Sequence, residues 1–189
     1  MKFFTADTHF NHSNIIEFCN RPFQSAEEMN EVLITNWNSK VGENDQVYHL
    51  GDFGYGELRE VFDRLNGKIY YIHSQEWTHE RAVLKYKDRF AQISPLATIS
   101  AKKEYDVFIT LCHYQMAKWP KSHYNHWHLF AHSHGRATPI GKSHDAGVDN
   151  NNFFPLSLKE IAKIMDERPD NPNYVKQRGF YRQKLEREE

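Results

Sequence analysis

The chain has 189 residues, of which 39% are hydrophobic and 26% charged, and its formal net charge is −1. These values are typical of one globular domain with a single core, and they indicate neither a membrane span nor a general binder of nucleic acid. Two cysteines are too few for a disulfide framework, so we expect a cytoplasmic location. The 12 histidines point instead to metal chemistry with imidazole and carboxylate ligands.

The first half of the chain alternates predicted strands with predicted helices. Ser25 and Glu28 form an S-x-x-E capping box, which predicts the start of a helix that apolar residues then continue at helical spacing. Strands are predicted at residues 2–6 (KFFTA), 46–50 (QVYHL) and 69–72 (IYYI), and a second helix over residues 58–65. Such alternation favours an α/β or α+β fold with layered sheets and helices.

The second half of the chain contains two more apolar runs and a last helix. The runs at residues 107–111 (VFITL) and 127–131 (WHLFA) predict strands. A second capping box, Ser157 with Glu160, predicts the start of the last helix. After Glu167 the chain is charged and contains proline and asparagine, so we expect a domain over residues 1–166 and a loosely docked tail over 167–189.

Acidic and histidine residues follow four of the predicted strands, where open α/β sheets place their sites. They are Asp7 and His9 (D-T-H), Asp52 (G-D), His113 (L-C-H), and His132 with His134 (A-H-S-H-G). In an extended segment, residues two apart point to the same side, so each pair can converge on one ion. Two carboxylates and four imidazoles suit two nearby divalent cations that share a carboxylate.

The order of these motifs resembles that of the calcineurin-like metallophosphoesterases. That family has D-x-H, then G-D, then a single histidine, then [G/A]-H-x-H. The resemblance extends from Phe3 to about Ile161 and is strongest with small bacterial and phage members, through TADTHFNHSNII and GVDNNNFFPLSL. It implies a two-layer β-sandwich flanked by helices, with a dinuclear metal site at the strand ends. Asp145 and Asp149, in DAGVDNNN, also resemble a family segment, although such residues cap turns as well.

The resemblance implies a role for each of the six residues. Asp7, His9 and His134 would hold one metal, His113 and His132 the other, and Asp52 would bridge them at the centre of catalysis. Manganese is the expected metal, with iron, zinc or nickel as alternatives. A metal-bound hydroxide would attack phosphorus while the cations absorb charge on the phosphoryl oxygens.

The third family motif, G-N-H-[D/E], is absent after IYYI, where the chain reads HSQEWTHE. Counted from the strand, Gln75 would replace the metal-binding asparagine and Glu76 the histidine that acts as general acid. Counted from the next helix, Thr78 would replace the asparagine, and His79 with Glu80 would match H-[D/E]. We favour the second alignment, which makes His79 the expected general acid. A simple connecting loop is the alternative.

The predicted function is therefore hydrolysis of a phosphodiester or phosphomonoester. The segment HYQMAKWPKSHYNHWH is rich in aromatic residues and contains Lys118 and Lys121, which favours a small nucleotide-like substrate. A folded loop that buries Trp119 and Tyr124 explains the same residues equally well. A second hypothesis is a metallophosphoesterase fold that acts as a binding module without catalysis, as the altered third motif suggests.

Overall fold

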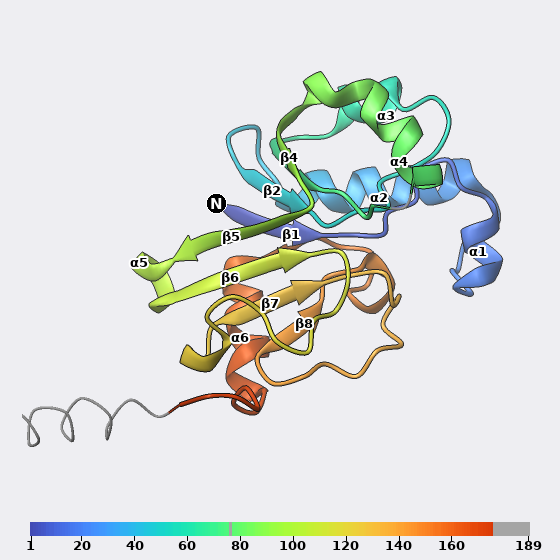
Figure 1. Ribbon diagram of the computed structural model, residues 1–189. Helices are drawn as coiled ribbons and strands as arrows, with labels where there is room; N and C mark the ends of the chain where they lie inside the picture. The colour runs from blue at the N-terminus through green and yellow to red at the C-terminus, as the bar shows by residue number, and fades with distance from the viewer. Residues whose placement is uncertain (76, 176–189) are drawn as a thin grey trace, which may run out of the picture.

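The protein is described by a computed structural model that covers residues 1–75 and 77–175, without the side chains of residues 77–79. The described chain is an α+β fold with two sheets and surrounding helices (Figure 1), which confirms the expected fold class. None of its helices is long and apolar enough to cross a membrane.

The first sheet has the strand order β4–β3–β2–β1–β9. Its strands are β1 (Lys2–Thr5), β2 (Gln46–His49), β3 (Lys68–Ile72), β4 (Phe90–Ser94) and β9 (Leu156–Ser157). Strands β1 to β4 are parallel, and only β9 runs antiparallel to its neighbour. The carboxyl ends of β1 and β2 therefore lie side by side at one edge of the sheet.

The second sheet has the order β5–β6–β7–β8. Its strands are β5 (Leu96–Ala101), β6 (Val107–Cys112), β7 (Trp127–Phe130) and β8 (Ser143–Asp145). Strand β5 is antiparallel to β6, whereas β6, β7 and β8 are parallel. The carboxyl ends of β6 and β7 are thus neighbours as well.

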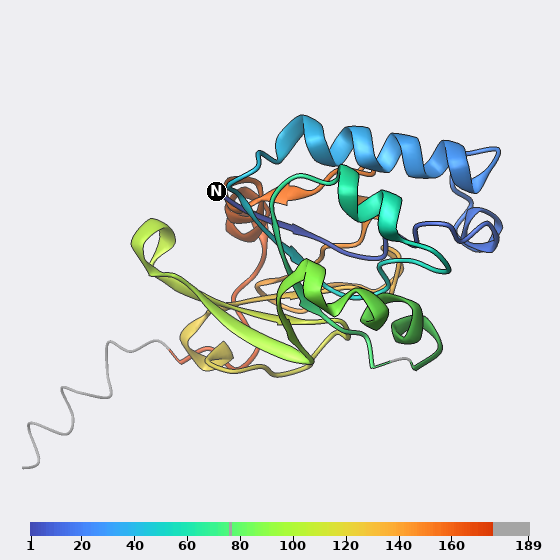
Figure 2. The same cartoon turned by 90° about the horizontal axis from the view of Figure 1, so that it is seen from above.

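Alternating side chains of the first sheet enter two different cores. Phe3 and Val47 belong to a core shared with Met29 and Trp37 of α2 (Ala26–Lys40) and with α3 (Arg59–Arg64), which cover one side of the sheet (Figure 2). Phe4 faces the other way, into a core shared with the second sheet. The period-two pattern of a strand buried on both faces explains why β1 reads as an unbroken apolar run.

The core between the sheets is closed by α6 (Leu158–Glu167). Ile161, Ala162 and Met165 of this helix pack with residues of both sheets, such as Phe4 and Leu129. The two sheets therefore share one hydrophobic core, and their strand ends are held at fixed positions. The finer expectation, that this is the metallophosphoesterase sandwich, stays a prediction.

Both predicted helix starts are observed. The Ser25 hydroxyl accepts a hydrogen bond from the Glu28 amide, although the Glu28 carboxylate accepts from Gln24 rather than from Ser25. At α6 the capping box is complete, because the Ser157 hydroxyl and the Glu160 carboxylate each accept from the other's backbone amide. Each cap satisfies an amide that the first helical turn leaves without a partner.

Several short elements were not expected from the sequence. Besides β4, β5, β8 and β9, they are α1 (Asn14–Phe18), α5 (Lys102–Tyr105), and the 3-10 helices η2 (Ser122–Tyr124) and η3 (Val148–Asn150). The helix expected after β3 is observed as α4 (Trp77–Val83), followed by the 3-10 helix η1 (Leu84–Arg89). Residues after the expected domain end at 166 also remain packed. Asn171 is buried and donates hydrogen bonds to the carbonyls of Ser122 and His126.

Candidate metal centre

The loops that follow β1 and β2 are hydrogen-bonded to each other. The Asp7 amide donates to the Gly51 carbonyl over 3.1 Å, and the His9 amide donates to the Asp52 carbonyl over 3.0 Å. On the second sheet, the Ala131 amide donates to the His113 carbonyl over 2.8 Å. These bonds extend the parallel pairing beyond the strands, so the polar residues after each strand are brought to one place.

Two groups of ligand atoms converge at these strand ends, and Asp52 belongs to both. Asp7, His9 and Asp52 form one group, and Asp52, His113 and His132 form the other. Within each group the candidate ligand atoms lie within 4.8 Å of one another. All except His132 are buried. Five of the six residues expected from the sequence are thus brought together, with Asp52 between the two groups.

The backbone is strained at most of these positions. Positive φ angles occur at Asp7 (53°), His9 (51°), Asp52 (52°), His132 (67°) and His134 (48°), which are five of the six expected ligands. A residue with a side chain rarely adopts this left-handed region, which costs of the order of 1 kcal/mol or more. Such strain persists where tertiary contacts enforce it, and it is concentrated at functional sites.

Hydrogen bonds orient the His113 ring toward the group. Its Nδ1 donates to the Leu50 carbonyl over 2.7 Å, which leaves Nε2 with its lone pair. That Nε2 lies 3.2 Å from Nδ1 of His132 and 3.8 Å from Oδ2 of Asp52. Burial lowers the pKa of His113, so the ring is neutral at pH 7 and can bind a metal. Two imidazole nitrogens and a carboxylate oxygen are borderline ligands that suit transition-metal ions.

The electrostatics around Asp7 favour a cation. Burial raises the pKa of Asp7 well above its ordinary value, and the charges of Asp52, Asp145 and Asp149 raise it further. Its Oδ2 accepts a hydrogen bond from the His132 amide over 2.9 Å, whereas its buried Oδ1 receives none from the described residues. A divalent cation would satisfy this oxygen and remove the repulsion between the carboxylates.

Two glycines leave room for this cluster. An added Cβ at Gly51, whose φ is +91°, would overlap the His113 ring and lie 3.0 Å from its Cγ. An added Cβ at Gly147 would lie 2.9 Å from Oδ2 of Asp7. The donor set, the unsatisfied carboxylate oxygen and these close approaches together fit a metal centre.

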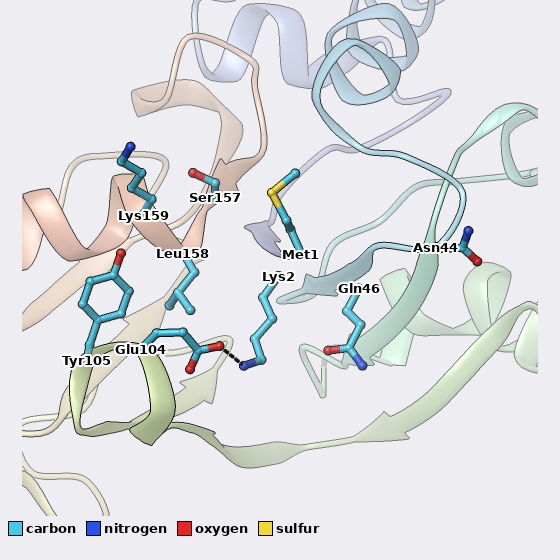
Figure 3. A pocket seen from close by; sticks show the side chains of 9 residues that line it. All are labelled: Met1, Lys2, Asn44, Gln46, Glu104, Tyr105, Ser157, Leu158 and Lys159. Carbon is cyan, nitrogen blue, oxygen red and sulfur yellow. Dashed lines mark hydrogen bonds and ion pairs between the residues drawn. The ribbon is translucent and has the colours of Figure 1, made fainter.

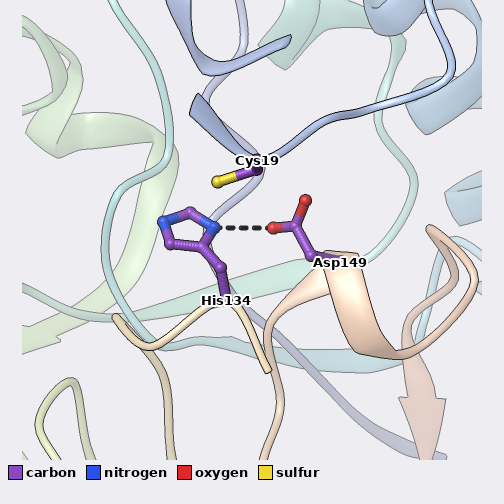
Figure 4. Close-up of side chains that lie close together, drawn as sticks. All are labelled: Cys19, His134 and Asp149. Atoms are coloured by element: carbon purple, nitrogen blue, oxygen red, sulfur yellow. Dashed lines mark hydrogen bonds and ion pairs between the residues drawn. The ribbon is translucent and has the colours of Figure 1, made fainter. Parts of the chain in front are cut away.

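His134 is placed differently from the other expected ligands. Its ring stacks beside that of His9 at a centroid distance of 5.4 Å, but its Nδ1 lies 2.7 Å from Oδ2 of Asp149. Among the described residues it is grouped with Cys19 and Asp149 (Figure 4). Asp149 was noted in the sequence only for its resemblance to a family segment. Arg21, which pairs with Asp149, has no sequence signal that distinguishes it from a surface arginine.

Hydrogen bonds to Glu80 of α4 stabilise the loop after β3. The buried Oε1 of Glu80 accepts hydrogen bonds from the Tyr71 hydroxyl and from both the amide and the hydroxyl of Ser74. Gln75 is exposed and has a φ of 65°. Glu76 and the side chains of Thr78 and His79 lie outside the described residues, so neither alignment of the third motif is tested.

The aromatic loop between β6 and β7 packs against the second sheet. The Trp119 indole is buried, donates to the His126 carbonyl over 3.0 Å and lies beside the His128 ring at a centroid distance of 5.2 Å. Tyr124, by contrast, is 46% exposed. Lys121 is exposed as a residue, and its ammonium lies 3.6 Å from the centre of the Phe108 ring. Folding thus accounts for Trp119 and Lys121 but not for Tyr124.

A pocket of about 540 Å³ lies at the opposite end of the first sheet (Figure 3). It is lined by residues at the start of β1 and β2 and of α6, among them Met1, Gln46 and Leu158. The acidic and histidine cluster lies beyond the other ends of these strands. The pocket is therefore separate from the candidate metal centre.

The fold and the site together define an α+β protein with acidic and histidine residues gathered at the strand ends of two sheets. The chain belongs to the same family as the uncharacterized protein MJ1445 of Methanocaldococcus jannaschii, with 32% identity over 174 residues, which cover 86% of this chain and 89% of that protein. It is also similar to the crystal structure of AQ665 from Aquifex aeolicus, a protein of unknown function, with a TM-score of 0.67 and 25% identity. That similarity covers 87% of this chain and 98% of AQ665. No family model matches the chain.

Proposed function

We propose that this protein is a dinuclear metal-dependent phosphoesterase that hydrolyses a phosphodiester or a phosphomonoester. The observation that supports it most is the position of Asp52, which is shared by the two groups of converging ligand atoms. One carboxylate between two sets of imidazoles and carboxylates is the arrangement that two nearby divalent cations require. The expected location of such an enzyme is the cytoplasm.

Each residue of the cluster has a defined task in this proposal. Asp7, His9 and His134 would hold one cation, His113 and His132 would hold the other, and Asp52, which belongs to both groups of converging ligand atoms, would be shared between them. When bound, the cations provide a water of lowered pKa as nucleophile and absorb charge on the phosphoryl oxygens. The protein contributes the positions of the ligands, because the strained loops and the His113–Leu50 hydrogen bond hold the side chains in place before a cation binds.

The expected cations are two manganese ions, and the expected proton donor to the leaving group is His79. Mixed nitrogen and oxygen ligands suit manganese, iron, zinc or nickel better than calcium, which prefers oxygen alone. A small nucleotide-like phosphoester is the proposed substrate. The Tyr114 ring lies 4.8 Å from the His132 ring between centroids, so an aromatic face stands beside the proposed metal ligands.

The test is hydrolysis of bis(p-nitrophenyl) phosphate by the purified chain with manganese. Asp52→Asn should reduce the rate by about 10³-fold or more, because removing the shared carboxylate disrupts both cation positions at once. Asp106→Asn is a matched control, since Asp106 is exposed and has a similar φ of 54°. Its activity should equal that of the wild type.

Two other outcomes contradict the proposal. Equal activity of the Asp52→Asn and wild-type chains would remove Asp52 from the reaction. A wild-type chain that binds two cations but hydrolyses no member of a broad panel of mono- and diesters would be a binding module instead. Counting bound manganese by inductively coupled plasma mass spectrometry distinguishes this case from a chain that binds no metal.

A further inference from the structure

We propose that Arg21 and Asp149 are positioning residues for the metal centre. Their buried ion pair holds the His134 ring in the orientation and tautomer in which Nε2 is turned toward a cation. This inference rests on the proposed function, because it assigns the cation that His134 would meet to the same centre. It concerns residues that lie far apart in the sequence and outside the two groups that share Asp52.

The ion pair between Arg21 and Asp149 is bidentate and buried. Nε and Nη2 of Arg21 donate to Oδ1 and Oδ2 of Asp149 over 2.7 Å and 2.8 Å. The side chain of Arg21 is 0% exposed and that of Asp149 is 8% exposed. A planar guanidinium that donates two parallel hydrogen bonds fixes the carboxylate in direction as well as in position. Asp149 therefore offers a rigid acceptor to its other neighbour.

That neighbour is His134, whose Nδ1 lies 2.7 Å from Oδ2 of Asp149. Arg21 donates to both oxygens of Asp149, so this carboxylate is placed as the acceptor from His134. In that arrangement Nδ1 of His134 carries the proton and Nε2 keeps a lone pair. In Figure 4 the second ring nitrogen points away from Asp149. Metal-binding histidines are typically held in this way.

Arg21 also connects this histidine to the loop that carries Asp7 and His9. Its Nη1 donates to the Thr8 carbonyl over 3.0 Å, and its Nη2 donates to the Asp7 carbonyl over 2.7 Å. These carbonyls belong to the strained D-T-H loop, which carries Asp7 and His9. One guanidinium thus fixes both the first loop and, through Asp149, the last histidine. The spacing between the two parts of the centre depends on it.

A rival explanation is that Cys19, His134 and Asp149 bind a cation themselves, since their ligand atoms converge. The surrounding charges oppose it. The positive charge of Arg21 is in contact with Asp149, and its hydrogen bonds occupy both carboxylate oxygens. The group is better explained as support for His134 than as a metal site of its own.

The first experiment measures manganese affinity by isothermal titration calorimetry. Asp149→Asn should weaken manganese binding at one of the two sites by about 10- to 100-fold. A loss of this size is typical when a residue that orients a metal-binding histidine is replaced. In a His134→Ala background, the same Asp149→Asn change should have no further effect, because Asp149 acts through that ring. Equal losses in both backgrounds, or no loss in either, would overturn the proposal.

Two control variants separate the explanations. Cys19→Ser should leave the affinity at the wild-type value, and a loss as large as that of Asp149→Asn would show that the three residues bind the cation directly. Glu160→Gln is a matched carboxylate-to-amide change, because Glu160 caps α6 and pairs with Lys40 away from the centre. It should lower stability without changing manganese affinity. A weaker affinity here would mean that any destabilised variant loses metal.

A second measurement does not require bound metal. Long-range proton–nitrogen NMR spectra of the metal-free chain should show His134 protonated at Nδ1 in the wild type and a mixture of tautomers in Asp149→Asn. If Asp149→Asn does not fold, Arg21→Lys replaces it. This change keeps the positive charge but loses the bidentate hydrogen bonds to Asp149, so it should give a mixture of His134 tautomers with a larger share of the Nδ1-protonated form. A wild-type chain that binds no manganese overturns the proposed function. An Nε2-protonated His134 in the wild type overturns the positioning role.

Discussion

The metal centre and the loop after β3 both contain a buried carboxylate, but the two carboxylates have different surroundings. Asp7 faces other carboxylates, and its Oδ1 receives no hydrogen bond from the described residues. Glu80, in α4, likewise has one oxygen, Oε2, that receives no hydrogen bond from the described residues, but its Oε1 accepts three, from Tyr71 in β3 and from Ser74 in the loop before α4. A carboxylate with its own donors stabilises a loop. Carboxylates that repel one another in a buried cluster favour a nearby cation.

This contrast changes the interpretation of H-S-Q-E-W-T-H-E. Ser74 and Glu80 join the two ends of the segment inside the protein, so part of it is structural. The side chain of His79 lies outside the described residues, so its role as general acid stays a prediction. The difference between the two regions can be tested by changes that should affect metal binding in one and only stability in the other.

The largest effect is expected at the metal centre, from Gly51→Ala. The new Cβ would overlap the His113 ring, and alanine is strained at a φ of +91°. We expect manganese affinity to fall by at least about 10-fold and the free energy of unfolding to fall by more than about 1 kcal/mol. Gly56→Ala is the control, because its φ is +64° but nothing lies within 4 Å of the added Cβ.

Calorimetric titration with manganese and urea denaturation of both glycine variants measure these quantities. Gly56→Ala should lose only the stability that backbone strain costs. If Gly51→Ala keeps wild-type affinity while the chain stays folded, the His113 ring is not required at its observed position.

A smaller effect, on stability alone, is expected from Glu80→Gln in the loop after β3. The amide keeps the volume but loses the charge that strengthens hydrogen bonds from Tyr71 and Ser74, so unfolding should become easier by about 1–3 kcal/mol. Tyr71→Phe, which removes one of the three donors, should cost about 1 kcal/mol. Urea denaturation measures both. A loss of manganese affinity as large as that of Gly51→Ala would place Glu80 in the metal centre instead.

An effect that depends on pH concerns His128, a second buried side chain that local partners satisfy. Its Nδ1 donates to the Thr110 carbonyl, and its Nε2 accepts from the Met116 amide, a pair of bonds that only the neutral ring can make. Burial lowers the pKa of His128 to about 4. Between pH 6.5 and 4 the unfolded chain binds the proton and the folded chain does not, so acid favours unfolding.

His128 should therefore contribute stability fully above about pH 6.5 and lose it at up to about 1.4 kcal/mol per pH unit as the pH falls toward 4. Urea denaturation at several pH values in this range measures the slope. The His128→Gln chain should show a slope smaller by up to one proton. An unchanged slope would mean that His128 is already protonated in the folded state.

Much of the candidate metal centre could be predicted because its residues follow apolar strands directly. The runs KFFTA, QVYHL, VFITL and WHLFA are long enough to be recognised, and the polar residue after each run is then placed at a sheet edge. The strands that escaped prediction lack this signal. β8 consists of the polar residues Ser143, His144 and Asp145, all buried, which only tertiary partners can satisfy.

The sequence by itself determined the fold class, five strands, the two capped helices and the identity of the acidic and histidine residues. These follow from hydrophobic periodicity and local capping, which act over a few residues. Tertiary structure alone decided that Asp52 is shared between two groups, that Glu80 supports its own loop, and that Arg21 meets Asp149. The last pair is 128 residues apart in the chain. No local pattern encodes such a contact, because it forms only when two sheets and their loops are packed together.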